Sequence, residues 1–299
     1  MRTLRTILLP ALLAPAVLTA QSGAQRVDTT FAFERGGSVA LGLVSGEIRV
    51  VTGRENEVRL LATIERGRLE TTLTRSHVSV QAKSVNGRMG AARYELTVPV
   101  GTRVDANAVS GTITVRGTGT EVEAHTVSGG IRVEDASGIV DVGTVSGDID
   151  LRNASGRISV ATVSGEFAGE SVRGDLEAEA VSGTITVRRG GLRSFRASTV
   201  SGDVSYDGTL APGGDYRINA HSGDVTLAVP ANGGVSLDLE TWSGEITSDF
   251  PLTLQPGDNL NRRNRRMTFT IGQGGARLSA ETFSGDIAIR RAPARTPEE

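Results

Sequence analysis

The chain has 299 residues, of which 38% are hydrophobic, 38 are Gly and none is Cys. This apolar content indicates a folded chain, and the lack of Cys excludes disulfides, thiol catalysis and thiolate metal sites. With 32 basic and 34 acidic residues, the net charge of −2 provides no overall field that would attract nucleic acid or an anionic membrane.

Residues 1–24 have the pattern of a secretory signal peptide. Arg2 and Arg5 precede an apolar run from Ile7 to Leu18, with cleavage after Ala24 or Ala20. The run is too short to cross a bilayer, which needs about 20 residues. We therefore predict an exported protein, periplasmic, outer-surface or secreted, with no membrane span after signal cleavage.

Residues 25–108 are predicted to form an N-terminal β region or cap. Short segments alternate between apolar and polar residues and are separated by Gly and Asn turns. An early Val44-Ser45-Gly46 motif stands apart in this region. Because a stack of strands exposes unpaired edges at its ends, we expect the region to cover one of them.

From residue 109 to 290, the tripeptide Val-Ser-Gly or a close variant recurs before an alternating strand. The interval between its serines is 18 residues four times, and later intervals are 19, 21, 21 and 41. The longest is expected to be two repeats with one degraded turn between them. The predicted turn residues are Ser110, Gly111, Ser128, Gly129, Ser146, Gly147, Ser164, Gly165, Ser182, Gly183, Ser201, Gly202, Ser222, Gly223, Ser243, Gly244, Ser284 and Gly285.

Each repeat predicts one coil of a parallel β-solenoid. In the segment from Asp148 to Leu151, Ile149 and Leu151 point to one side and the two Asp to the other, because side chains alternate along a strand. Such a unit buries its apolar face only by stacking on its neighbours. The predicted fold is therefore all-β, a solenoid or β-helix with coils of about 18 to 21 residues and an N-terminal β cap. Nine steps of ~4.8 Å give a rod of roughly 43 Å.

The turn residues and their neighbours carry further expectations. Gly suits a turn with positive φ, and the Ser hydroxyl can bond a backbone group at the corner. The residue before Ser is expected to fill the narrow interior, where large aromatics would overpack. This column changes from Val to larger residues where the coils widen: Val109, Val127, Val145, Val163, Val181, Val200, His221, Trp242 and Phe283.

A loop at about 251–267 is predicted to interrupt the repeats, and residues 291–299 to form a flexible tail. The basic run of the loop suggests an anionic-ligand site at Arg262, Arg263, Arg265 and Arg266, since Arg binds carboxylate and phosphate bidentately. The alternative is a solvated loop that lies against acidic residues. No aromatic residues interleave to stack bases, so no nucleic acid partner is expected.

The residue after Ser-Gly is acidic in many copies, which would form a column of like charges. It suggests either a row of Ca²⁺ sites or solvated turn residues. The column comprises Glu47, Asp148, Glu166, Asp203, Asp224, Glu245 and Asp286.

The sequence from His221 to Asp224 contains the residue types of a hydrolase triad. Adjacent side chains on a strand face opposite sides, which argues against one and favours His221 as core. Trp242 is likewise expected to be packed inside. We expect no metal or other cofactor.

Three segments, Tyr94–Val115, Ala220–Pro230 and Thr282–Ile289, resemble the bacterial putative-adhesin family of exported β-strand-repeat domains of unknown function. The resemblance implies a β-helical exported domain with an adhesive role, and it supplies no catalytic residues.

Two function classes follow for this chain. The first is a non-catalytic adhesin or structural binding module of the cell envelope, with a cell-surface polysaccharide or an envelope protein as partner. The second is a polysaccharide-active β-helix enzyme, which would need a groove lined by non-repeating ionisable groups. A Ca²⁺-stabilised repeat protein is a further alternative. The sequence does not specify the oligomeric state.

Overall fold

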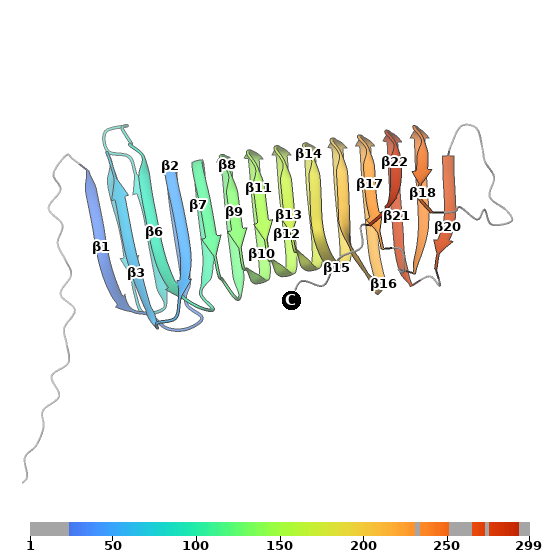
Figure 1. Ribbon diagram of the computed structural model, residues 1–299. Helices are drawn as coiled ribbons and strands as arrows, with labels where there is room; N and C mark the ends of the chain where they lie inside the picture. The colour runs from blue at the N-terminus through green and yellow to red at the C-terminus, as the bar shows by residue number, and fades with distance from the viewer. Residues whose placement is uncertain (1–23, 231–233, 251–264, 273–274, 293–299) are drawn as a thin grey trace, which may run out of the picture.

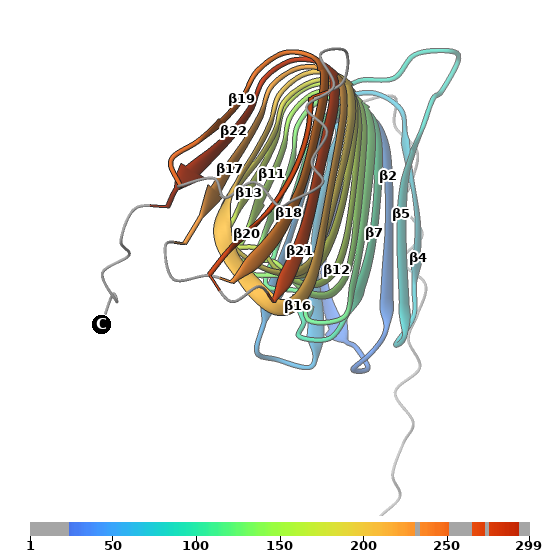
Figure 2. The ribbon, with the colours of Figure 1, turned by 90° about the vertical axis from the view of Figure 1, so that its right-hand side faces the viewer.

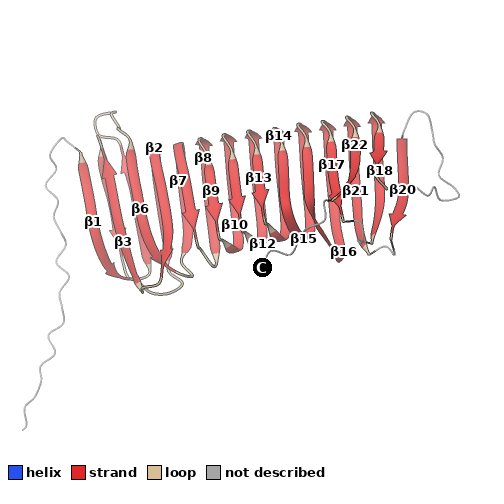
Figure 3. Ribbon diagram, viewed as in Figure 1, coloured by secondary structure: helices blue, strands red, loops and turns tan. Residues whose placement is uncertain are grey.

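The computed structural model describes residues 24–230, 234–250, 265–272 and 275–292. Every regular element within these ranges is a β-strand (Figure 3). The strands are β1 (Gln25–Ala32), β2 (Ser38–Gly53), β3 (Glu57–Ile64), β4 (Arg68–Leu73), β5 (His77–Lys83), β6 (Ala92–Pro99), β7 (Arg103–Arg116), β8 (Glu121–Ser128), β9 (Ile131–Glu134), β10 (Ser137–Ser146), β11 (Ile149–Arg152), β12 (Ser155–Ser164), β13 (Phe167–Glu170), β14 (Arg173–Ser182), β15 (Ile185–Ser201), β16 (Val204–Ser222), β17 (Val225–Val229), β18 (Val235–Ser243), β19 (Ile246–Ser248), β20 (Arg265–Ile271), β21 (Ala276–Ser284) and β22 (Ile287–Arg291).

The strands lie side by side in one row (Figure 1), and the view turned by 90° shows two layers that are joined along both edges (Figure 2). We call the layer that contains β8, β10, β12 and β14 the first sheet and the layer that contains β9, β11 and β13 the second sheet. The Ser-Gly turns form one edge, since β10 ends at Ser146 and β11 begins at Ile149. At the other edge the chain returns to the first sheet, as β15 does when it pairs first with β13 and then with β14.

Most neighbouring strands are parallel and pair equivalent residues of successive repeats. Ser146 pairs with Ser164, and Ser164 pairs with Ser182, each 18 residues later. In the second sheet, Ile149 pairs with Phe167. The prediction of an all-β, mainly parallel, solenoid-like fold is therefore confirmed.

The interior lies between the two sheets and follows the alternation of the strands. Ile149 and Leu151 are fully buried, whereas Asp150 between them is partly exposed. The expectation that large aromatics would overpack the 18-residue coils is wrong, because Phe167 of β13 is buried in one of them. In the wider coils, Phe195, Tyr206 and Tyr216 are buried and in ring contact, with centroids 5.2 and 5.8 Å apart. They belong to β15 and β16, where the coils are longer and the ladder is irregular, which provides the space.

Antiparallel strands lie at the N-terminal end of the stack. β1 pairs with β3 and β3 with β6 in antiparallel fashion, and β4 pairs likewise with β5. β2 connects this group to the repeats, because Ser45 pairs directly with Ser110. The early motif therefore does not stand apart, and the predicted boundary at 108/109 falls inside β7.

The order of the coils at the C-terminal end differs from the order of the chain. β21 pairs with β16 on one side and with β18 on the other, so Ser284 lies between Ser222 and Ser243. β22 lies in the same way between β17 and β19. The prediction that Ser284 begins a coil beyond Ser243, two repeats further on, is therefore wrong.

β20 forms the antiparallel neighbour of β18 at this end. Residues 265–267 of the predicted loop are thus part of a strand. Residues 251–264 of that loop, the predicted signal peptide up to residue 23 and the tail from 293 onward lie outside the described residues.

The tight corners explain why Gly recurs after Ser. Gly147 has a φ of 154°, and a Cβ built on it would lie 2.1 Å from the carbonyl oxygen of Gly129 in the preceding coil. Any side chain would therefore separate the two coils at the corner.

Candidate binding face

The phase of the first-sheet strands places the residue before each Ser on the outside. In β10, Thr144 is 5% exposed and the adjacent Val145 is 47% exposed. Because side chains alternate, the buried residues Val140 and Val142 put Thr144 inside and Val145 outside. The prediction that this column fills the core is therefore wrong. The alternation that leads into each turn could have revealed the correct phase.

This exposed column forms a continuous strip, which we call the apolar ridge. It follows the edge that the Ser-Gly turns form, and its neighbouring members lie one strand spacing apart, about 4.8 Å. A contiguous apolar strip on a protein surface is a mark of an interaction site. In stack order the apolar ridge consists of Val44, Val109, Val127, Val145, Val163, Val181, Val200, His221, Phe283 and Trp242.

Aromatic rings form the C-terminal part of the ridge. The rings of His221 and Phe283 are stacked with centroids 5.1 Å apart, and those of Phe283 and Trp242 are stacked at 6.1 Å. Trp242 is 54% exposed, so the predicted burial of His221 and Trp242 is wrong. Because the insertion of β21 puts Phe283 between the other two rings, both of its faces are covered and its edges point outward.

A shallow groove of about 450 Å³ lies beside these rings. Its other wall consists of residues two positions earlier on the same strands, including Asn219, Glu281 and Glu240. These are ladder positions that repeat along the stack, so the groove is part of the repeat pattern.

The acidic corner residues bond to the backbone of the next coil. Asp148 Oδ1 accepts a hydrogen bond of 3.0 Å from the amide of Glu166, the equivalent residue one repeat later. Asp203 accepts one from the amide of Asp224 at 2.9 Å, and Asp286 accepts one from that of Glu245 at 2.8 Å. The column thus joins successive coils. Within the described residues, no group of three or more His, Cys, Asp or Glu could hold a metal ion.

The residues of the apparent hydrolase triad do not assemble. The His221 ring lies against Phe283, and Asp224 Oδ1 accepts a hydrogen bond of 2.8 Å from the amide of Asp286. Ser222 is exposed at the corner. The argument from strand geometry against a triad therefore agrees with the structure.

The hydroxyls of the repeated serines are exposed and make no hydrogen bond in the part of the chain that is described. The expected bond from each hydroxyl to the backbone is therefore absent there. Some of the Thr side chains two residues earlier take part in the corner instead, since Thr241 Oγ1 donates to the Gly285 carbonyl at 3.0 Å and Thr282 Oγ1 to that of Gly223 at 3.2 Å. The equivalent hydroxyls of Thr126, Thr162 and Thr199 are buried and have no hydrogen-bond partner among the described residues.

The structure describes two of the four arginines of the predicted anionic-ligand site. Arg262 and Arg263 lie outside the described residues, and Arg265 is the first residue of β20. Arg266 makes a bidentate contact with Asp238, at 3.0 and 2.6 Å. Its bond to this carboxylate raises the pKa of Arg266. This guanidinium therefore joins β20 to β18.

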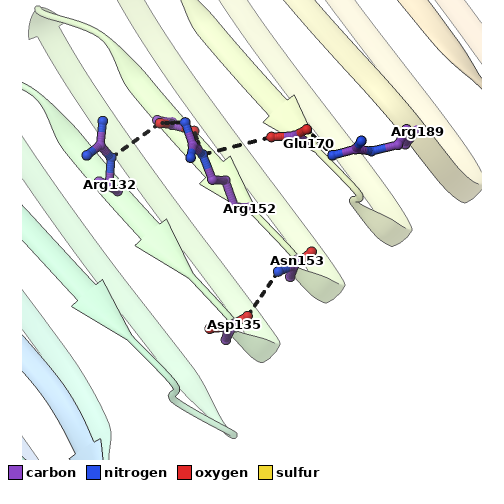
Figure 4. A network of polar contacts seen from close by, with 7 residues as sticks. Arg132, Asp135, Arg152, Asn153, Glu170 and Arg189 are labelled. Carbon is purple, nitrogen blue, oxygen red and sulfur yellow. Dashed lines mark hydrogen bonds and ion pairs between the residues drawn. The ribbon is translucent and has the colours of Figure 1, made fainter. Parts of the chain in front are cut away.

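The second sheet carries a network of ion pairs on its outer surface (Figure 4). Asp150 contacts Arg132 at 3.3 Å and Arg152 at 3.0 Å, and Arg152 lies 4.0 Å from Glu170, which also pairs with Arg189. The bond to Asp150 raises the pKa of Arg152. At the adjacent turn, Asn153 donates a hydrogen bond of 3.1 Å to Asp135. Charges on this sheet therefore alternate in sign along the stack and compensate one another.

No helix in the described ranges is long and apolar enough to cross a membrane. The fold and the ridge define a class of protein: a rod of stacked β-coils with a repetitive outer surface. The chain matches the Toastrack DUF4097 family over residues 16–213 and 197–290, and it belongs to that family.

Solved structures of similar fold share little sequence with this chain. One is described as a "putative adhesin" of Bacteroides fragilis, 9% identical, with 89% of this chain and 97% of that chain covered and a TM-score of 0.41. A "putative lipid binding protein" of Parabacteroides distasonis is 12% identical over 89% and 96%, with a TM-score of 0.36. A "putative cell adhesion protein" of Clostridium sporogenes is 9% identical over 89% and 100%, with a TM-score of 0.28. No curated protein matches the chain.

Proposed function

We propose that the protein is an exported, non-catalytic binding module of the cell envelope, and that the apolar ridge is its binding face. The observation that supports this is the exposure of seven Val side chains in one line that ends in three stacked rings. Water-exposed apolar groups in a line are costly to keep and gain free energy when a partner covers them. The partner is a component of the envelope, a protein or a surface polysaccharide.

The export step rests on the signal-peptide pattern of residues 1–24. The antiparallel strands of residues 25–108 act as a cap that protects the end of the stack, which consists of coils of about 18 to 21 residues. Arg262, Arg263 and Arg265 remain a candidate site for an anionic ligand.

The repetition of the groove residues argues against the enzyme alternative. Catalysis needs a few convergent groups in unlike environments. The groove beside Trp242 presents ladder positions, and its two acids, Glu240 and Glu281, are paired residues on neighbouring strands of one sheet face. Such a surface suits binding along its length.

The experiment measures retention of the labelled mature chain on envelope fractions and on a panel of surface polysaccharides. The double variant Val145→Ser/Val163→Ser should reduce retention about tenfold or more. A matched control, Val85→Ser/Val100→Ser, changes equally exposed valines away from the ridge and should bind like the unaltered chain. Equal retention of both variants would contradict the proposal. So would release of reducing sugar that stops in Glu281→Gln.

A further inference from the structure

The two sheets differ in how their charges are compensated. On β9, β11 and β13 every acidic residue is in an ion pair: Glu134 with Arg116, Asp150 with Arg132, and Glu170 with Arg152. On the first sheet, β8, β10, β12 and β14 carry six acidic residues and two arginines. Five of these acids make no ion pair within the described residues, namely Glu121, Glu123, Asp141, Glu177 and Glu179.

These acids lie on the first sheet at different distances from the apolar ridge. Glu179 is two residues before its ridge valine on the strand, Glu123, Asp141 and Glu177 are four residues before theirs, and Glu121 is six residues before. On β14, Glu177, Glu179 and Val181 are all exposed, since residues two apart point to the same face of a sheet. The two arginines, Arg157 and Arg173, lie near the other ends of their strands, away from the ridge.

On its opposite side, the ridge is followed by acidic corner residues in the two central coils, Asp148 and Glu166, and by Gly130 and Thr184 in the coils on either side of them. An apolar line with negative charge on both sides is complementary to an apolar line with positive charge on both sides.

The spacing of the ridge restricts the shape of that partner. Ridge side chains repeat every ~4.8 Å along the stack. An α-helix laid along the stack repeats its apolar stripe every turn, about 5.4 Å, which keeps it within about 2 Å of register across four strands. An extended strand has side chains on one face every ~6.7 Å, so they are out of register with the ridge side chains after one step. The geometry therefore favours a helix.

We propose that the middle of the ridge docks a basic amphipathic helix of a partner protein. Its apolar stripe covers Val127, Val145, Val163 and Val181, and its Lys and Arg residues meet the acids on either side. This inference rests on the proposed function and names its partner.

Other occupants fit less well. A second copy docked through the same patch would place acids against acids, which is repulsive. An anionic membrane surface is repelled in the same way. A sugar ring stacks on an aromatic face, and the middle of the ridge carries Val side chains at Val127, Val145, Val163 and Val181 in place of aromatic rings.

The test uses the full mature chain and a labelled helical probe of about 20 residues, 30 Å long, with Leu at helical spacing and Lys elsewhere. Binding is followed by fluorescence anisotropy. The expected result is saturable binding that weakens with salt. Two other probes serve as controls, one with Glu in place of each Lys and one with Leu and Lys in strict alternation. Both should bind at least about tenfold more weakly.

The matched variants identify the surface. Neutralising the acids beside the ridge, with Glu123→Gln, Asp141→Asn, Glu177→Gln and Glu179→Gln, should weaken binding of the helical probe about tenfold or more. The control neutralises four exposed acids of the N-terminal region and should bind like the unaltered chain: Glu34→Gln, Glu65→Gln, Glu70→Gln and Glu95→Gln.

An equal loss of helical-probe binding in the two neutralised variants would overturn the inference. The inference would also be overturned if the alternating probe bound the unaltered chain as tightly as the helical probe does. If the helical probe fails to bind while envelope retention still depends on Val145 and Val163, the inference is wrong and the proposed function stands. A concentration-dependent dimer that disappears in the ridge variant would also overturn it, in favour of a second copy.

Discussion

The backbone amide of Asp286 donates a 2.8 Å hydrogen bond to Asp224 Oδ1, although the two residues are 62 positions apart in the chain. Each is the acidic residue that follows a Ser-Gly corner. The bond exists because the coil of β21 and β22 stacks directly on that of β16 and β17. The same contact recurs between other corners, so the acidic column has a structural role in addition to its charge.

Replacing Asp224 by Ala should lower the free energy of unfolding by about 1 kcal/mol, because the amide of Asp286 loses its acceptor. The control Asp224→Asn keeps a carbonyl oxygen at the same place and should be nearly neutral. Urea denaturation of the mature chain measures both. If Asn destabilises as much as Ala, the charge matters and not the hydrogen bond.

Chelation of divalent cations should leave the melting temperature unchanged. The corner carboxylates of Asp148, Asp203 and Asp224 accept bonds from backbone amides and so have fewer free lone pairs for an ion. Thermal melts with EDTA and with added Ca²⁺ provide the measurement. A melting temperature that falls with the chelator and returns with Ca²⁺ would support the calcium alternative, since a ligand of the folded state stabilises it.

The substitution Ile149→Asp should destabilise the fold by roughly 3 kcal/mol or more, because it buries an unpaired charge. The same change at Val145, on the ridge, should cost less than about 1 kcal/mol, because that side chain is half exposed. Denaturation curves of the two variants therefore test the strand phase. Comparable losses would mean that the ridge is part of the core.

Gly147→Ala should cost at least about 3 kcal/mol, from the strain of its positive φ and from overlap with the Gly129 carbonyl. Gly119 provides the control, since a Cβ there would lie 3.8 Å from its nearest neighbours. Gly119→Ala should be tolerated. A stable Gly147→Ala protein with unchanged circular dichroism would show that the corners are less tight than described.

Alkaline pH should destabilise the protein in part through Tyr94. Burial raises the pKa of Tyr94, whose hydroxyl donates a 3.1 Å hydrogen bond to the Gly42 carbonyl. A raised pKa in the folded state means that this contribution is complete below pH ~10, the pKa of an unfolded Tyr, and is lost as the pH rises above it.

The variant Tyr94→Phe should therefore show a flatter loss of stability above pH ~10 than the unaltered chain, in urea titrations at several pH values. Phe167→Leu is a control that removes buried apolar volume without a titrating group, and it should keep the original slope. An unchanged slope in Tyr94→Phe would contradict the role of this tyrosine.

The repeat in the sequence was sufficient to predict the mainly parallel stack, because the 18-residue interval and the strand alternation are both local signals. The direction of the side chain before each Ser was also encoded locally. Val142 and Thr144 define the phase, but a Val at a conserved-looking repeat position suggests a core residue unless that phase is followed into the turn. The prediction of a buried column was therefore wrong because it assigned the residue before each Ser to the inner face of the strand, one residue out of phase with the alternation.

Other features had no local signal. Which coil lies beside which is decided by pairing between distant segments, so the place of Ser284 between Ser222 and Ser243 is not visible in an interval of 41 residues. The ion pair of Arg266 with Asp238 likewise depends on the antiparallel pairing of β20 with β18. The burial of Tyr206 and Tyr216 follows from the wider coils of β15 and β16, whose irregular ladder appears only in three dimensions.

The insertion of β21 and β22 into the stack has a consequence for biosynthesis. A ribosome delivers residues in order, and from β8 to β17 each new strand finds a neighbouring strand already made. β18 is different, because both strands that pair with it, β20 and β21, are translated later. The C-terminal end can therefore reach its native arrangement only once nearly the whole polypeptide has emerged. In a nascent chain arrested before residue 276, the coils up to β17 would be stacked, but β18 would lack β21, the strand that joins it to β16.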